Sequence, residues 1–400
     1  MRPPRFALYP VLLSLFLVFC SYCPLEAATH TWTGAGGNSL WSNAANWAGG
    51  KPTSSESGGT NVVFGSGTAS VCDIVGLTVD QIHFTGGGNT LSGTTTLGLS
   101  GATAFVNILS DTGTNTIAAT LPMVISGQNC FVDVVAGSLT LANNVSGTVG
   151  LRKRGAGTCT ITGNNSYTGP TSVVGGVLSL NSNGSNTAVP GNLVIGDQGS
   201  SNASVILQQA VEISDTATVT VYSDGTLNLN GKGETVGTLN VYGNVNLGGA
   251  SGVLVVTTAT NVFDPGIVTI GDGKFTQNGP LLMSGGTFQA SATGLLTLGA
   301  DVTATSSSVA GAAVNSPVKL AATRTLTVNA GAVQPELTFN GVIGEANLNT
   351  GLTKKGNGTL KLESNSSNTF TGTTTVESGT VQLLANSGRI VVGSLVIGND

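Results

Sequence analysis

A short string, in which a glycine leads two apolar residues that flank a polar one, recurs along the chain and limits the fold more than any other feature. It occurs at 137–141 (G-S-L-T-L), 176–180 (G-V-L-S-L), 225–229 (G-T-L-N-L), 237–241 (G-T-L-N-V), 294–298 (G-L-L-T-L) and 358–362 (G-T-L-K-L). Because successive side chains of a strand point to opposite faces, each string predicts a strand of about five residues with one apolar face. Glycine, asparagine and aspartate between the strings supply turns, so the sequence predicts an all-β protein.

Two longer segments, 150–180 and 351–383, repeat one another. In order, Gly150, Leu151, Lys153, Gly155, Gly157 and Thr158 match Gly351, Leu352, Lys354, Gly356, Gly358 and Thr359, and after a two-residue insertion Tyr167, Thr168 and Gly169 match Phe370, Thr371 and Gly372. Long-range self-similarity without a linker is typical of stacked repeats and disfavours a sandwich or a barrel. We therefore expect a right-handed parallel β-helix, with equivalent strands of successive turns about 4.8 Å apart.

The two copies resemble the autotransporter-associated β-strand repeat, also called the passenger-associated transport repeat. Its pattern is approximately K-x-G-x-G-T-L-x-L-x-G-x-N-x-Y-x-G-x-T-x-V-x-x-G-x-L. The repeat-motif residues are Lys153, Gly155, Gly157, Thr158, Tyr167, Gly169, Lys354, Gly356, Gly358, Thr359, Phe370 and Gly372. The first copy departs from the pattern at Cys159, where Leu is usual, and the second at Glu363–Ser364 and at Phe370. The segment 30–47 also resembles the start of mature proteins that carry these repeats.

The resemblance implies a secreted or surface-displayed β-helical passenger of a Gram-negative-type bacterium. Its partner would be the type V or another outer-membrane export machinery, and a surface polysaccharide is a further expected partner if the passenger is adhesive. In such proteins the repeat assists export and folding of the passenger and carries no catalytic residue.

The N-terminus predicts a Sec signal peptide over residues 1–28. Arg2 and Arg5 precede an apolar stretch at 7–19, and Ala27 and Ala28 supply small residues for cleavage. That stretch is shorter than the roughly 20 residues of a membrane-spanning helix. No later segment is apolar and long enough to span a bilayer, so we expect no transmembrane helix in the mature chain. The chain stops inside a second V-I-G-N-D-like string at residue 400, and we expect it to be a fragment of a longer protein.

Trp32, Trp41 and Trp47 are all the tryptophans of the chain. They allow two hypotheses. One is a cap over 29–60 that covers the open end of the β-helical passenger (61–400), because repeat proteins need capped ends. The other is a platform on which glycans stack. We favour the cap.

Composition and motifs argue against several classes of function. Only 8% of the residues are charged and the net charge is −5, which excludes the basic footprint of a nucleic-acid-binding protein. Of the two histidines, His83 is expected on the outer face. Cys72, Cys130 and Cys159 have neither the spacing of a zinc site nor that of a disulfide framework, and the latter two are expected in the core. We therefore expect no catalytic residue, metal or cofactor.

Two alternatives to a non-catalytic scaffold remain. A β-helical polysaccharide lyase or hydrolase would need acids and bases from neighbouring turns, such as two carboxylates about 5–9.5 Å apart. Asp197, Asp224, Asp272 and Asp301 instead follow or precede Gly or Ala at strand ends, where turns favour aspartate. A glycan-binding module is the second alternative. The basic runs 152–154 and 354–355 could bind an anionic polysaccharide, but their shared repeat position favours a solvated corner of the fold.

Overall fold

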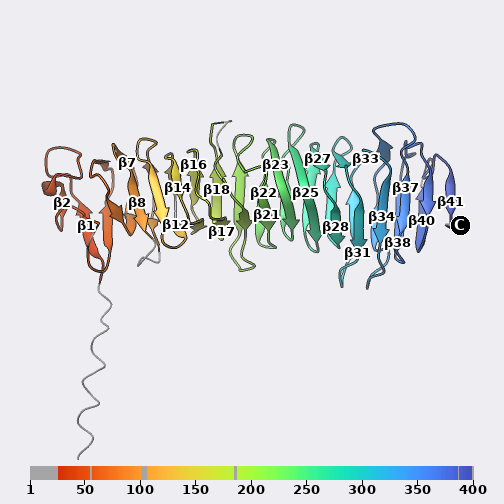
Figure 1. Ribbon diagram of the computed structural model, residues 1–400, viewed down its shortest axis with the longest axis horizontal. Coiled ribbons are helices and arrows are strands. Elements are labelled where there is room, and N and C mark those ends of the chain that lie inside the picture. Colours follow the sequence, from red (N-terminus) through yellow and green to blue (C-terminus); the bar gives the residue numbers. More distant parts are fainter. Residues whose placement is uncertain (1–25, 55, 101–105, 184–186, 386, 399–400) are drawn as a thin grey trace, which may run out of the picture.

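The computed structural model describes residues 26–54, 56–100, 106–183, 187–385 and 387–398. These residues form a rod of stacked turns, with the first turns at one end and the last turns at the other (Figure 1). Nearly all regular structure is β, apart from a three-residue 3-10 helix, η1 (Ala44–Asn46). The predicted all-β parallel β-helix is therefore confirmed. Of the predicted signal peptide, residues 1–25 lie outside the described residues, and the first strand begins at Ala28.

The first face of the rod is a sheet of 15 strands. Its strands are β4 (Ala69–Cys72), β7 (Asn89–Gly93), β10 (Thr114–Ile117), β13 (Ser138–Leu141), β16 (Thr158–Ile161), β18 (Gly176–Leu180), β20 (Ala203–Leu207), β22 (Gly225–Asn228), β24 (Asn244–Asn246), β26 (Ile267–Gly271), β29 (Thr287–Ala290), β32 (Ala312–Asn315), β35 (Leu337–Phe339), β38 (Thr359–Ser364) and β40 (Thr380–Ala385). Each strand pairs in parallel with that of the next turn, as Leu139 pairs with Cys159 and Cys159 with Leu178.

The second face follows the same rule. Its strands are β1 (Ala28–Trp32), β3 (Thr60–Phe64), β6 (Gln81–Phe84), β9 (Ile108–Ser110), β12 (Cys130–Val134), β15 (Leu151–Arg154), β17 (Thr171–Val173), β19 (Leu193–Ile195), β21 (Thr218–Val221), β23 (Gly233–Val241), β25 (Val253–Phe263), β28 (Leu281–Ser284), β31 (Val302–Thr305), β34 (Arg324–Val328), β37 (Leu352–Lys355), β39 (Thr374–Val376) and β41 (Leu395–Ile397). At the N-terminal edge the two-residue strand β2 (Trp47–Ala48) pairs with β1 in the antiparallel sense.

The third face is discontinuous. Near the N-terminus it is a four-stranded sheet of β5 (Thr78–Val79), β8 (Leu97–Ser100), β11 (Met123–Ser126) and β14 (Val145–Gly147). It resumes at the first halves of the long strands β23 and β25, which continue onto the second face, and goes on through β27 (Lys274–Gln277), β30 (Leu295–Leu298), β33 (Val318–Leu320) and β36 (Ile343–Glu345). Between β14 and β23, the described residues of this face contribute one isolated bridge, from Val189 to Ile213.

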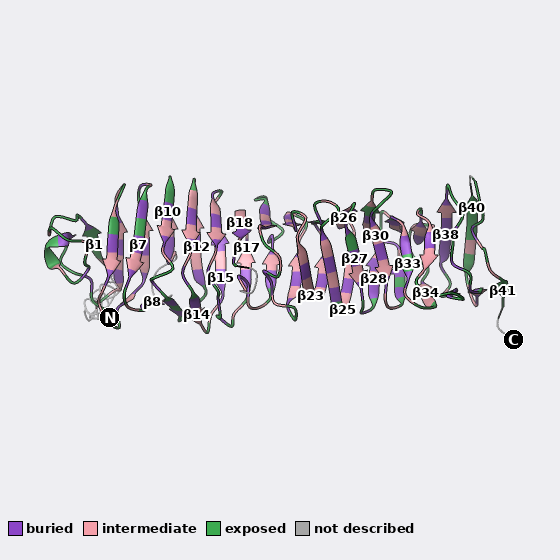
Figure 2. Ribbon diagram, turned by 90° about the horizontal axis from the view of Figure 1, so that it is seen from above, coloured by how far each residue is buried: buried purple, intermediate pink, exposed green. Residues whose placement is uncertain are grey.

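Alternating side chains fill the interior of the rod, so buried and partly exposed residues alternate along most strands (Figure 2). Leu, Val and Ile face inward, whereas Thr, Ser and Asn cover the outside. Cys130 and Cys159 are buried free thiols, as predicted, and Cys159 lies between Leu139 and Leu178 in the ladder of inward side chains. His83 faces outward, with its Nε2 2.9 Å from the Asp111 carboxylate.

Candidate functional site

The lysine of each repeat is buried at a corner of the rod. Lys153 and Lys354 are 0% and 1% exposed, and they follow the inward-facing Leu151 and Leu352 by two residues. The Lys153 ammonium donates hydrogen bonds to the carbonyl oxygens of Arg154, Gly155 and Gly175, at 2.6, 2.8 and 3.1 Å. The first two belong to its own turn, and the third belongs to the next turn.

The second lysine repeats this arrangement. Its ammonium donates to the carbonyl oxygens of Lys355, Gly356 and Ser378, at 2.9, 2.7 and 3.0 Å. We expected the basic positions to form a solvated corner, and for Lys153 and Lys354 that expectation is wrong. The corner leaves backbone carbonyls pointing inward, and a buried acceptor without a partner costs about 1–3 kcal/mol, so a buried ammonium is the better solution. The flanking Arg152, Arg154 and Lys355 do face outward.

Burial changes the acidity of both lysines. It lowers the pKa of Lys153 to about 8, against smaller opposing effects of Cys159 and Asp133. Burial also lowers the pKa of Lys354, while the nearby Glu336 carboxylate acts in the opposite direction. Burial therefore disfavours the charge itself, and what the ammonium contributes is the set of hydrogen bonds that satisfies carbonyls of two successive turns.

Each repeat also contains an asparagine that bonds three successive turns; it is the N of G-x-N-x-Y in the repeat pattern but is not among the repeat-motif residues named above. The Asn165 side chain accepts a hydrogen bond from the Val145 amide of the preceding turn (2.9 Å) and donates one to the Ala188 carbonyl of the following turn (2.8 Å). Asn368 does the same with Ile343 and Ile390, at 2.8 Å each. The signal was available, because both asparagines lie two residues before the aromatic residue of the motif.

The motif aromatics fill the core where the third face has no strand. Tyr167 and Phe370 are 1% and 0% exposed. The Tyr167 hydroxyl lies 2.6 Å from the Thr171 hydroxyl, and burial raises its pKa well above the ordinary range. Phe370 needs no such partner, which explains why phenylalanine can replace tyrosine here.

Two glycine positions of the motif are required by the backbone. Gly155 and Gly356 have φ of 75° and 78°, in the left-handed region that side chains disfavour. A Cβ on Gly169 would lie 2.2 Å from the Gly150 nitrogen, and one on Gly372 would lie 2.4 Å from the Thr350 carbonyl carbon. The remaining motif residues, Gly157, Gly358, Thr158 and Thr359, lead into β16 and β38. The motif glycines thus lie where the backbones of neighbouring turns approach closely.

The three tryptophans lie in the first layer of the rod. Trp32, Trp41 and Trp47 are 6%, 0% and 6% exposed, so no indole face is open to a sugar ring in this arrangement. Trp47 contacts Trp32 and Trp41 edge-on, with ring centroids 5.0 and 5.2 Å apart, and Trp41 packs on Phe64 of the next turn. The Trp47 indole N–H donates to the Trp41 carbonyl (3.0 Å).

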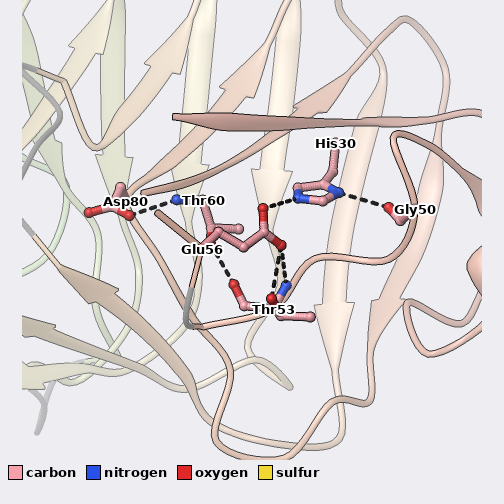
Figure 3. A network of polar contacts seen from close by, with 6 residues as sticks. All are labelled: His30, Gly50, Thr53, Glu56, Thr60 and Asp80. Atoms are coloured by element: carbon pink, nitrogen blue, oxygen red, sulfur yellow. Dashed lines mark hydrogen bonds and ion pairs between the residues drawn. The ribbon is translucent and has the colours of Figure 1, made fainter. Parts of the chain in front are cut away.

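A polar network fastens the loop after β2 to β1 (Figure 3). His30 is buried, and its Nδ1–H donates to the Gly50 carbonyl while its Nε2 lies 2.8 Å from the Glu56 carboxylate. Glu56 also accepts from the amide and hydroxyl of Thr53, at 3.0 and 2.9 Å. Burial raises the pKa of Glu56, but the hydrogen bonds from His30 and Thr53 outweigh it and hold the pKa below its usual value.

Most other carboxylates act as backbone caps. Glu212 and Glu234 are almost fully buried. Glu212 accepts from the Ser182 amide and hydroxyl, and Glu234 accepts from the amides of Glu212, Ile213 and Thr235. Burial raises the pKa of Glu234 to about 7, despite these hydrogen bonds. Since both carboxylates are buried and occupied by the chain itself, they do not form an accessible acid–base pair.

Three of the four aspartates expected at turns also bind backbone or hydroxyl groups of neighbouring turns, whereas Asp197 accepts from the Gly199 amide of its own turn. Asp224 accepts from the amides of Asp197 and Gln198, and Asp301 accepts from the Thr325 amide. Among the residues that the structure describes, no three His, Cys, Asp or Glu side chains are grouped to hold a metal ion. Within the same residues, no helix has the length and hydrophobicity of a membrane span.

The two repeats also match a known family of sequence repeats. The sequence profile of the passenger-associated transport repeat matches residues 151–180 and 352–383. Searches of curated proteins and of solved structures gave no significant match. The two matched segments contain both buried lysines, both bridging asparagines and both core aromatics. The chain is therefore a parallel β-helix that carries two copies of the passenger-associated transport repeat.

Proposed function

We propose that the protein is a secreted or surface-displayed, non-catalytic passenger scaffold whose two repeats assist the folding of the rod during export. The repeat match and the parallel β-helix support a passenger scaffold. The observation that carries the proposal is the inward direction of the motif side chains. Each repeat uses its lysine and its asparagine to bond the backbones of successive turns, and neither residue presents chemistry to a substrate.

The repeats would act by making the addition of the next turn favourable. A β-helix grows as each new turn pairs with the last one, so a chain that emerges through a pore can fold progressively outside. While the rod is incomplete and the turn after Asn165 has not yet folded, the Asn165 NH2 group has no acceptor and the Lys153 ammonium lacks one of its three acceptors. The next turn supplies the Ala188 and Gly175 carbonyls that complete both. Two such positions, about half the rod apart, would stabilise the growing end at intervals.

The N-terminal region would serve the same process. We propose that residues 1–28 are a signal peptide for the Sec route and that a type V or another outer-membrane export machinery carries the chain outward. The layer over 29–60 would cap the first turn, because β2 covers the free edge of β1 and the tryptophans cover the end of the core. A covered edge prevents pairing with another rod.

Export of paired variants tests the proposal. Lys153→Met combined with Lys354→Met keeps the length of both side chains and removes both ammonium groups. We expect a several-fold smaller amount of protease-resistant protein at the cell surface, with unchanged synthesis of the precursor. Lys355→Met is the matched control, since that lysine faces outward and is 48% exposed. Equal surface delivery of the double variant and the unmodified protein would contradict an export role of the repeats.

A further inference from the structure

The two repeats differ on their outer faces, and only the first carries a pair of arginines. Positions 151 and 153 match 352 and 354 in residue type and in burial, whereas the outward Arg152 is replaced by Thr353 in the second copy. The architecture of the repeat therefore does not require the arginine. Besides its contact with the Phe131 ring, Arg152 can therefore serve a role that the repeat itself does not set.

A groove runs along the second face, and along the corner that follows it, beside these arginines. One part has a volume of about 580 Å³ and is lined by both arginines, by Asp197 and by small residues, among them Gly175 and Gly176. A second part of about 350 Å³ shares Arg152 and Asp197 with the first and ends at Tyr222. The strands from β15 to β21 are four neighbours in the sheet, which gives the groove a length of about 14 Å. A short oligosaccharide has this length.

The two ends of the groove are held rigidly. At the N-terminal end, the guanidinium carbons of Arg152 and Arg154 lie 6.0 and 4.9 Å from the centroid of the Phe131 ring. At the other end, Tyr222 stacks on Tyr242, with centroids 5.9 Å apart, and Tyr242 stacks on Phe263 at 4.5 Å. Tyr222 is partly exposed and lines the second part of the groove, so the stack ends at the groove.

The charges of the groove indicate a neutral ligand. Arg154 is paired with Asp133 at 3.5 Å, and Arg152 lies 3.9 Å from Asp197, so each arginine has an acidic neighbour. The Arg152–Asp197 distance exceeds that of a hydrogen bond, and both side chains are about 40% exposed. A guanidinium donor next to a carboxylate acceptor suits vicinal hydroxyl groups, whereas the exposed Asp197 carboxylate repels an acidic sugar.

We propose that this groove binds a neutral polysaccharide, with a sugar ring against Tyr222 and its hydroxyl groups hydrogen-bonded to Arg152 and Asp197. Apolar C–H faces of sugars pack on aromatic rings, and the tyrosine stack presents such a ring at a fixed position. The site goes beyond the scaffold role, because binding of a glycan does not depend on how the rod is exported. The scaffold would then be adhesive through its own outer face.

Affinity electrophoresis of the purified protein tests the site, using native gels that contain dextran, a mannan or a galactan, and polygalacturonate as the acidic probe. We expect at least one neutral polysaccharide to retard the protein. Tyr222→Ala and Arg152→Ala should each weaken binding at least tenfold, while Tyr222→Phe, which keeps the ring, should bind within about threefold of the unmodified protein. Far-UV circular dichroism confirms that each variant is folded.

Lys355→Ala is the matched control, because it removes one outward positive charge at the corresponding corner of the second repeat. It should not change the retardation. The proposal is overturned if no neutral polysaccharide retards the protein, if polygalacturonate alone does so, or if Tyr222→Ala binds as well as Tyr222→Phe. None of these results bears on export, so this test and that of the scaffold role fail independently.

Discussion

Replacing Asn165 with alanine should loosen two specific boundaries between turns. The substitution removes the acceptor of the Val145 amide and the donor to the Ala188 carbonyl, and the asparagine is only 5% exposed. A buried backbone group left without a partner costs about 1–3 kcal/mol, so the two together cost about 4 kcal/mol. In a stacked-repeat protein, stability is close to a sum of nearest-neighbour terms, so each boundary should lose about 2 kcal/mol.

Hydrogen exchange followed by mass spectrometry measures this loss locally. A free energy of 2 kcal/mol corresponds to about 30-fold faster exchange where local opening limits the rate. We expect that acceleration in peptides covering 143–149 and 187–192, with unchanged exchange in distant turns such as those of β26 and β29. Ser166→Ala is the control, since the side chain of this neighbouring residue is exposed.

Two results would refute the reasoning. Exchange that accelerates equally in distant turns would show that the rod opens as a single unit, so that the amide does not act at particular boundaries. Exchange that is unchanged at 143–149 and 187–192 would show that the two hydrogen bonds contribute nothing to the stability of the stack.

Three further predictions concern buried charges. Lys153→Met should lower the free energy of unfolding by about 3 kcal/mol. Three corner carbonyls lose their donor, at about 2 kcal/mol each, and removing the cost of burying the ammonium offsets about half of this loss; an unchanged urea midpoint would contradict the prediction. Glu234 has its pKa raised to about 7, so its contribution to the free energy of unfolding is full below pH 4.5 and is lost, by about 3 kcal/mol, as the pH rises through 7. Glu234→Gln should flatten the curve of unfolding free energy against pH between 4.5 and 7. Glu56 has a lowered pKa, so its contribution is full above pH 4.5 and lost on further acidification; exchange in 49–54 should accelerate there, and should not do so in Glu56→Gln.

The alternation of apolar residues was sufficient to predict the architecture. Each glycine-led string forms a strand with its Leu or Val inside, because alternating side chains of a strand point to opposite faces and only one face of each stacked strand borders the core. The strings did not predict the face, however. The strand in 137–141 lies on the first face, whereas those in 237–241 and 294–298 lie in the other sheet. Faces depend on the length of each turn, which the strings do not encode.

For the repeat lysine, two rules disagree on whether the side chain faces the core or the solvent. Alternation from Leu151 places Lys153 inside, whereas the solvated corner that the shared repeat position favoured would place it outside, where lysine is usually found. The corner carbonyls that accept hydrogen bonds from the buried ammonium are brought together only by the folded backbone, so the sequence pattern does not show them. The groove at Arg152 was equally hidden, because it needs Asp197 and Tyr222 brought beside β15 by turns of unequal length.

The interruption of the third face between β14 and β23 has a mechanical consequence. Along this stretch two sides of the rod are continuous ladders of backbone hydrogen bonds, and among the described residues the other side has a single bridge. The rod therefore resists stretching along the two hydrogen-bonded faces and stretches more easily along the third face. Thermal bending should concentrate in one plane near the middle of the rod. Shear on the molecule would then open that flank first and leave the ladders on the opposite sides intact.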